Sequence, residues 1–199
     1  MQPSDRRRLG EALVFALDAH AGQTRKGKPV PYASHLLQVA GLVLEHGGDV
    51  EQAMAALLHD TLEDCEGVDE QALRARFGPR VTAMVVACSD LLEGDSPARK
   101  SPWTERKTRY LEHLRSADRD TQLVAACDKL HNLANIVTDL RTEGADFLER
   151  FNASPPQTLW YFEQVRASLG PDLPAALLLD FDTQLEALRP YTGPASPAA

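Results

Sequence analysis

The sequence has little of what marks several large classes of protein. Its three cysteines, Cys65, Cys88 and Cys127, are odd in number and widely spaced, and no two of them form a CxxC pair. Neither a disulfide framework nor a cysteine-rich zinc site is therefore expected. The opening residues, MQPSDRRRLG, lack the apolar core of a signal peptide. No apolar run approaches the roughly 18 residues that a membrane span needs. We expect a cytoplasmic protein that does not enter a membrane.

Positive charge is also in short supply. The chain has 21 Lys and Arg residues against 29 Asp and Glu residues, which gives a formal net charge of -8. A general nucleic-acid binder needs a basic face for phosphate contacts, so nucleic acid is not an expected partner. A small anionic ligand is compatible with this balance, because a local basic pocket can outweigh the overall sign. The oligomeric state is not indicated by the sequence.

Alternating strand patterns and internal repeats are absent as well, and helical spacing of apolar residues dominates. The predicted fold class is all-α. A length of 199 residues with 43% hydrophobic content favours one domain, placed at residues 1–189, followed by a flexible tail at 190–199. Residues 93–102 are interpreted as a mobile loop. The predicted helices cover 7–22, 35–47 with Ser34 as the cap, 50–63, 69–77, 80–89, 103–116, 121–142, 154–170 and 173–189.

One helix carries an unusual concentration of ionisable groups. The stretch ALLHDTLED, residues 56–64, follows an apolar run. On a continuous helix His59 lies beneath Glu63, and Asp60 lies beneath Asp64, because residues four apart share a face. Burying one such group without a hydrogen-bond or charge partner costs on the order of several kcal/mol. A divalent cation removes that cost by giving each lone pair a partner.

Further ligands for such a cation are present elsewhere in the chain. His35 opens the preceding helix, directly after the basic loop QTRKGKPVPY, and Asp128 lies in the apolar helical run LVAACDKLHN. With His59 and Asp60 they supply two imidazoles and two carboxylates. Nitrogen and oxygen ligands without thiolate suit manganese, iron or zinc better than calcium.

The order H…HD…D resembles the HD-domain metal-dependent phosphohydrolases. The blocks AHAGQTRKGKPVPYASH, AALLHDTLED, FGPRVTAMVVACSD, ERK and CDKLHNLANI are similar to the hydrolase domain of RelA/SpoT enzymes over roughly residues 19–140, and WYFEQV extends the similarity. The resemblance implies a compact multi-helix fold with a Mn²⁺ site between helices. It also implies cleavage of the 3′-diphosphate from the alarmone (p)ppGpp by a stand-alone small alarmone hydrolase, whose partner is a small nucleotide.

The resemblance also implies a role for particular positions. Those matching metal ligands are His35, His59, Asp60 and Asp128. Those matching the acidic pair that positions and activates water are Glu63 and Asp64. Those matching substrate contacts are Arg25 and Lys26 near the nucleobase, Asn132 and Tyr161 beside the nucleoside, and Lys107 with Lys129 facing phosphate.

Three departures from the family pattern bear on the substrate. Leu36 replaces a proline that commonly follows the first histidine, the loop from Arg25 to His35 is one residue longer than usual, and Lys129 replaces an arginine. Lysine does not make the bidentate phosphate contact of arginine. Two alternatives therefore stay open beside (p)ppGpp: the same chemistry on ppApp or on the 2′-phosphate of NADPH, and a non-catalytic nucleotide-binding module.

Simpler interpretations apply to single residues. His59 and Asp60 can form a hydrogen-bonded core pair, and Glu63 and Asp64 can face solvent at a helix end, although negative charge is disfavoured there. We expect His131 to be a structural histidine bonded to the backbone rather than a fifth ligand.

Overall fold

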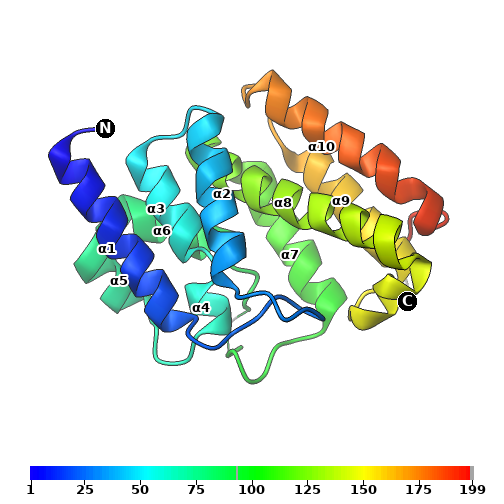
Figure 1. Ribbon diagram of the computed structural model, residues 1–199, viewed down its shortest axis with the longest axis horizontal. Coiled ribbons are helices and arrows are strands. Elements are labelled where there is room, and N and C mark those ends of the chain that lie inside the picture. Colours follow the sequence, from blue (N-terminus) through cyan, green and yellow to red (C-terminus); the bar gives the residue numbers. More distant parts are fainter. Residues whose placement is uncertain (93, 198–199) are drawn as a thin grey trace.

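The computed structural model describes residues 1–92 and 94–197, which form ten α-helices, two short 3-10 helices and no β-strand (Figure 1). The predicted all-α class is confirmed. The first six helices are α1 (Pro3–Ala19), α2 (Ala33–Glu45), α3 (Val50–Leu58), α4 (Thr61–Asp64), α5 (Glu70–Phe77) and α6 (Pro79–Cys88). The remaining elements are α7 (Trp103–Ser116), α8 (Arg119–Glu143), η1 (Ala145–Arg150), α9 (Pro155–Ser168), α10 (Ala175–Leu188) and η2 (Arg189–Tyr191).

Several helices begin where a short polar side chain satisfies a free backbone N–H group. Asp118 accepts a hydrogen bond from the backbone N–H of Thr121 at 2.8 Å and thereby caps α8. Asp49 and Asp69 cap α3 and α5 in the same way. Gly144, with φ of +85°, ends α8 in a backbone conformation that other residues rarely adopt.

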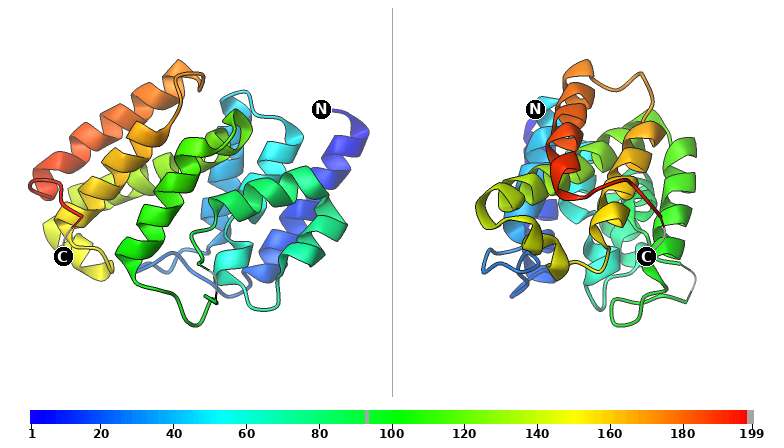
Figure 2. Two further views of the ribbon diagram at one scale, coloured as in Figure 1. Left: turned by 180° about the vertical axis from the view of Figure 1, so that it is seen from behind. Right: turned by 90° about the vertical axis from the view of Figure 1, so that its right-hand side faces the viewer.

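Helix α8 is the central element of the fold. It contacts α2, α3, α6, α9, α10 and η1. Figure 1 shows α1 to α6 on one side of the molecule and α7, α9 and α10 on the other, with the two termini at opposite ends. The view from behind in Figure 2 keeps this division, and α8 contacts helices of both groups.

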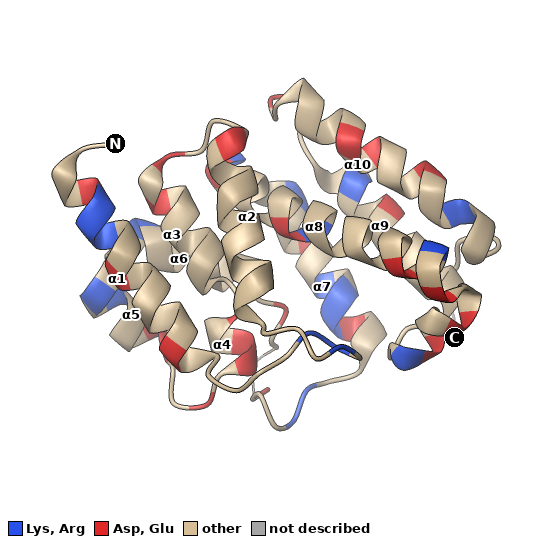
Figure 3. Cartoon of the chain, in the orientation of Figure 1, with Lys and Arg blue, Asp and Glu red and all other residues tan. Residues whose placement is uncertain are grey.

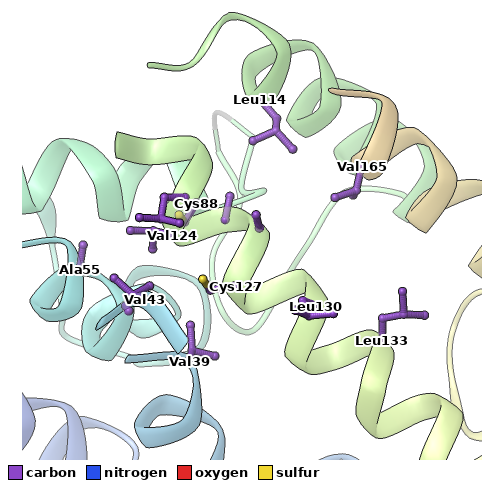
Figure 4. Close-up of a cluster of buried hydrophobic side chains, with 14 of the residues drawn as sticks. Val39, Val43, Ala55, Cys88, Leu114, Val124, Cys127, Leu130, Leu133 and Val165 are labelled. Carbon is purple, nitrogen blue, oxygen red and sulfur yellow. The ribbon is translucent and has the colours of Figure 1, made fainter. Parts of the chain in front are cut away.

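The apolar core surrounds the middle of α8. Val124, Cys127 and Leu133 of this helix are fully buried. In Figure 4 they lie among side chains of α2, α3, α6, α7 and α9, such as Val43 and Val165. Because the core forms around one helix, any polar group placed on that helix is held at a fixed position relative to the neighbouring helices.

The helix predicted at residues 50–63 is wrong in one respect, since it is interrupted. Helix α3 ends at Leu58 and α4 begins at Thr61, with His59 and Asp60 in the turn between them. The Thr61 hydroxyl donates to the Leu58 carbonyl at 2.7 Å, which occupies an acceptor that a continuous helix uses. The expected stacking of the two ionisable pairs on one straight helix is therefore replaced by a bend.

The predicted Ser34 cap is also wrong. Helix α2 begins at Ala33, and Ser34 lies inside its first turn, where its hydroxyl accepts from the Gln38 side chain at 3.0 Å. The backbone N–H of Ser34 instead bonds to Pro31 at 3.0 Å, because the preceding loop already turns there.

The end of the chain contacts α9. The backbone N–H of Ser196 donates to Pro156 at 3.1 Å, and the Gln157 side chain donates to Pro197 at 3.3 Å. Residues 198–199 of the predicted tail and residue 93 of the predicted mobile loop lie outside the described residues. The domain boundary at residue 189 and the mobility of both segments stay predictions. Among the residues that the structure does describe, no helix has the length and apolar character needed to cross a bilayer.

The central position of α8 predicts a strong contrast between two leucine substitutions. Leu133→Ala removes a fully buried side chain from α8 and leaves a cavity, so we expect a loss of about 2–5 kcal/mol in unfolding free energy. Leu179→Ala on α10 removes a side chain that is 65% exposed, and we expect a change within about 0.5 kcal/mol. Chemical denaturation of both variants measures the difference; equal losses would contradict the packing described here.

Candidate active site

Three buried side chains from three helical segments meet at one point. His35 comes from α2, His59 from the turn after α3, and Asp128 from the middle of α8. One ligand atom of each lies within 4.8 Å of the others, and each residue is about 1% exposed. The Asp60 carboxylate borders the same point, since its Oδ2 atom lies 2.9 Å from Nε2 of His59 and 3.5 Å from Nε2 of His35. The structure thus brings together the four residues that the sequence predicts as metal ligands.

Both imidazole rings are oriented by contacts on their far sides. Nδ1 of His59 lies 2.8 Å from the backbone oxygen of Ala56, so it carries the proton and leaves Nε2 as a free ligand. Nδ1 of His35 lies 2.8 Å from Nδ1 of His131. The ring of His131 in turn contacts the Asn135 side chain at 3.1 Å. With the far sides of both rings held in this way, the Nε2 atoms of His35 and His59 lie 3.2 Å apart.

The expected backbone partner of His131 is therefore wrong, because its ring contacts side chains. Burial, together with the charges of His35 and Arg25, lowers the pKa of His131 to about 4. A neutral His131 accepts or donates at His35 without adding charge. It supports the orientation of His35, a role that metal-binding histidines commonly need from a neighbour.

The four candidate metal ligands His35, His59, Asp60 and Asp128, called the ligand cluster below, favour a bound cation. Burial alone would raise the pKa of Asp128, but the ammonium group of Lys129 and the imidazole of His59 hold it well below its usual range. Burial would lower the pKa of His59, but Asp60 and Asp128 raise it well above its usual range. The two carboxylates thus attract positive charge to the point between the rings. A divalent metal ion with neutral imidazoles satisfies that attraction, and these donors fit such an ion.

Both carboxylates are also held by neighbours. Lys129 and Asn132 donate to Asp128 at 2.5 and 2.7 Å. The Tyr32 hydroxyl donates to Oδ2 of Asp60, and burial followed by the charge of Asp60 raises the pKa of Tyr32, which keeps the donor protonated. Tyr32 is a site residue that the sequence reasoning missed, although its place three residues before His35 was a possible signal.

The acidic pair predicted for water activation lies on α4, next to the ligands. Lys100 donates to Glu63 at 2.9 Å and to Asp64 at 2.8 Å, so one ammonium group bridges the two carboxylates. Burial, with the nearby charge of Asp90, raises the pKa of Glu63. A carboxylate of raised pKa is a better proton acceptor near neutral pH. Lys100 was missed because residues 93–102 were interpreted as a mobile loop.

A second charged group lies behind this pair. Asp90 accepts from Arg106 and from Lys107, the latter at 2.5 Å, and is 4% exposed. Burial would raise the pKa of Asp90, but Lys107 and Arg106 lower it to about 2. The carboxylate therefore stays ionised and fixes both cations beside Glu63. Arg106 belongs to the ERK block, in which only Lys107 was singled out from the sequence.

A cavity of about 810 Å³ adjoins these groups. All the predicted contact residues line it, and Glu63 and Asp64 do so as well. The basic residues in its wall are Arg25, Lys26, Lys28, Lys100, Arg106, Lys107 and Lys129, against the acidic Glu63, Asp64 and Asp139. Figure 3 shows the basic loop between α1 and α2 and the acidic residues of α4 in this part of the molecule. A local basic excess thus exists in a chain of negative net charge.

The predicted substrate contacts occupy different parts of this cavity. Arg25 donates to Asn132 at 2.6 Å, which ties the basic loop to α8 close to Asp128. Lys26 reaches Asn152 at 3.3 Å. The ring of Tyr161 lies under Lys107, 5.0 Å from its ammonium nitrogen, and the Tyr161 hydroxyl is buried without a hydrogen-bond partner among the described residues.

The chain is similar to several known proteins. The family model described as HD domain matches residues 12–149. A guanosine-3′,5′-bis(diphosphate) 3′-pyrophosphohydrolase of Vibrio cholerae is 35% identical over 166 residues, which are 81% of this chain but only 22% of that protein. A protein of the same name from Danio rerio, designated MESH1, is 35% identical over 132 residues, 64% of this chain and 68% of that protein.

A solved structure is similar over nearly the whole length. It is described as a metazoan ortholog of SpoT that hydrolyses ppGpp, and it matches with a TM-score of 0.72 and 26% identity. The match covers 90% of this chain and 94% of the other. The chain therefore spans about a fifth of the Vibrio protein but almost all of this structural relative.

The ligand cluster predicts a metal-dependent gain in thermal stability. With Mn²⁺ about 100-fold above its dissociation constant, binding to the folded state adds about 2.7 kcal/mol. That gain corresponds to roughly 5–10 °C in Tm for a chain of this size. Asp128→Asn, which removes one ligand oxygen, should abolish most of the shift.

The matched control is Glu63→Gln, which changes a nearby acid that is not among the candidate ligands. We expect it to keep the shift. Thermal unfolding with and without the ion measures both variants; a shift that survives Asp128→Asn in full would rule out this cluster as the site.

Proposed function

We propose, from the premise that this chain belongs to the HD domain family, that it hydrolyses the 3′-diphosphate of (p)ppGpp to GDP or GTP and pyrophosphate with the help of Mn²⁺. The proposal agrees with the names of the relatives, which are guanosine-3′,5′-bis(diphosphate) 3′-pyrophosphohydrolases. Those names describe the relatives, so the chemistry must be supported by the residues of this chain.

The observation that carries the proposal is the meeting of three groups at one cavity. The acidic pair on α4 and the lysines Lys107 and Lys129 line a volume of about 810 Å³. Tyr32 and Asn132, which donate to Asp60 and Asp128 of the buried ligand cluster, line it as well. Cavities of roughly 300–1,000 Å³ are typical of small-molecule sites. Ligands for a cation, a proton acceptor and phosphate-binding cations are what phosphoester hydrolysis requires.

His35, His59, Asp60 and Asp128 would hold the metal ion. When bound, a divalent ion lowers the pKa of water and withdraws charge from a phosphoryl group. The ligand types also suit iron and zinc. Mn²⁺ is our proposal because the resembled RelA/SpoT hydrolases use it.

The acidic pair moves the proton. Glu63, whose raised pKa makes it the stronger base, takes the proton of the attacking water, and Asp64 orients that water. Attack at the phosphorus joined to the 3′ oxygen forms a new P–O bond and breaks the bond to the 3′ oxygen. That oxygen takes up a proton and becomes the 3′-hydroxyl group, while pyrophosphate leaves with the oxygen of water.

The remaining residues bind and orient the nucleotide. Burial would lower the pKa of both lysines. Tyr161 and Asp90 raise the pKa of Lys107, and Asp128 raises that of Lys129, so both ammonium groups stay charged. We propose that they bind phosphate oxygens. Arg25 and Lys26, from the basic loop, are proposed to lie near the nucleobase.

The setting of the reaction is also a proposal. The three cysteines are free and buried, which suits a reducing compartment. We propose that the protein acts in the cytoplasm on a small nucleotide.

Glu63→Gln tests the mechanism. Loss of the proton acceptor should lower kcat about 10²- to 10⁴-fold with little change in KM. Pyrophosphate release from ppGpp, measured with Mn²⁺, reports the rate, and the thermal shift with Mn²⁺ shows that the metal still binds. Glu112→Gln, an exposed acid on α7, serves as the matched control and should retain full activity.

A substrate panel separates the rival functions. ppApp and NADPH are run beside ppGpp, because the longer basic loop and Lys129 distinguish this chain from the family pattern. Pyrophosphate release is measured for ppGpp and ppApp, and orthophosphate release is measured for NADPH. A clear preference for either alternative would replace the proposed substrate. A folded, metal-loaded protein that cleaves none of the three would favour a non-catalytic nucleotide-binding module.

A further inference from the structure

A polar stripe begins at Asp128 in the ligand cluster and runs along one face of α8 toward the C-terminal end of that helix. Asp128, Asn132, Asn135 and Asp139 follow one another at intervals of four, three and four residues. This spacing places them on the same side of a helix. The last three line the cavity. Asp128 and Asp139 are separated by eleven residues, or about 16 Å of helix.

The basic loop between α1 and α2 contacts this stripe at two points. Arg25 donates to Asn132 at 2.6 Å, and Lys28, three residues later, forms an ion pair with Asp139. Gly27 makes the intervening turn possible with φ of +73°. A loop that begins beside the ligand cluster thus ends over the far end of the cavity.

The position of the ion pair between Lys28 and Asp139 is not well explained by a contribution to stability alone. The Asp139 side chain is 9% exposed and that of Lys28 is 26% exposed, and both line the cavity. Partly buried ion pairs repay their desolvation cost poorly, so this one is weakly explained by stability. Its position on a cavity wall offers an acceptor and a donor, side by side, to a ligand.

The walls around the pair are apolar and aromatic. Ile136 and Phe147 line the same end of the cavity, and Phe147 packs edge-on against Phe151 at 5.4 Å between ring centroids. Lys28 lies 5.9 Å from the Phe147 ring centroid. Apolar walls with one pair of opposite polar groups suit a planar heterocycle that presents donors and acceptors along one edge.

A phosphate group suits this place less well. The carboxylate of Asp139 repels an anion and already neutralises Lys28. The end of the cavity at Asp139 is therefore a poor place for the 5′-phosphates of a nucleotide.

We propose that Asp139 and Lys28 select the guanine base. The guanine edge presents two donors, N1–H and the 2-amino group, beside the O6 acceptor. The Asp139 carboxylate can accept from both donors, and the Lys28 ammonium group can donate to O6. Adenine presents only one donor on that edge, so it satisfies the carboxylate less completely. The inference rests on the proposed function, because it takes the reacting phosphate to be at the ligand cluster.

The test compares guanosine and inosine 3′,5′-bis(diphosphate), which differ only in the 2-amino group. Equilibrium dissociation constants are measured by calorimetry with Mn²⁺ in a Glu63→Gln background, in which turnover is suppressed. We expect guanosine to bind roughly 10- to 100-fold more tightly than inosine, the discrimination typical of a good bidentate contact to a base.

Substitutions at the pair should have different effects. Asp139→Asn should reduce the guanosine preference to near one, because the amide offers one acceptor and places a donor against N1–H. Lys28→Met should weaken both nucleotides equally and keep the preference, because both carry O6. A merely structural role for the pair would change both ligands alike in both variants.

Glu143→Gln is the matched control, since it alters an acid of the same helix that pairs with Arg150 at the surface. It should leave the preference unchanged. If Asp139→Asn fails to fold, the double variant Lys28→Met/Asp139→Leu removes both charges together and should also lose the preference.

The possible failures are distinct. Equal binding of the two nucleotides, or an undiminished preference in a folded Asp139 variant, overturns the base-selection inference. Loss of the proposed function appears instead as absence of pyrophosphate release by the unmodified protein, which the binding measurement does not require.

Discussion

The arrangement of this protein depends on the buried charge of Asp128. An isolated carboxylate buried in an apolar core costs on the order of several kcal/mol in desolvation, unless its oxygens are paired with donors or positive charges. Lys129 and Asn132 pair with it from its own helix, and His35 and His59 approach it from two others. A site assembled in this way needs its contributing helices to be fixed relative to one another, and the core around α8 provides that.

Helix α8 combines two tasks that are usually divided between elements. Leu133 and Val137 are buried in the core, whereas Asn132, Asn135 and Asp139 of the polar stripe line the cavity. Both faces fit on one helix because a period of 3.6 residues separates them around its circumference. A helix of 25 residues is also long enough to carry the ligand cluster near its middle and the base-selecting acid nearer its end.

Basic residues outnumber acidic residues in the cavity wall, whereas acidic residues outnumber basic residues in the whole chain. An acidic protein of net charge -8 concentrates basic groups around the proposed substrate. Acids beside those groups keep them ordered: Asp90 holds Arg106 and Lys107, and Asp139 holds Lys28. Phosphate binding in this arrangement draws on cations that are already in place, which lowers the entropy lost when the substrate binds.

The sequence by itself determined the helical class and most helix positions, because these follow from local periodicity. Its motif also predicted the four side chains that the structure brings together. The tertiary structure decided the break between α3 and α4, which a period count over residues 50–63 does not reveal. It also decided the partners of Lys100, His131 and Lys28. The contacts of these residues with Asp64, His35 and Asp139, respectively, join positions that are 36, 96 and 111 apart. Local propensity carries no information on such pairs, because they form only when packed helices bring distant loops to the same cavity wall.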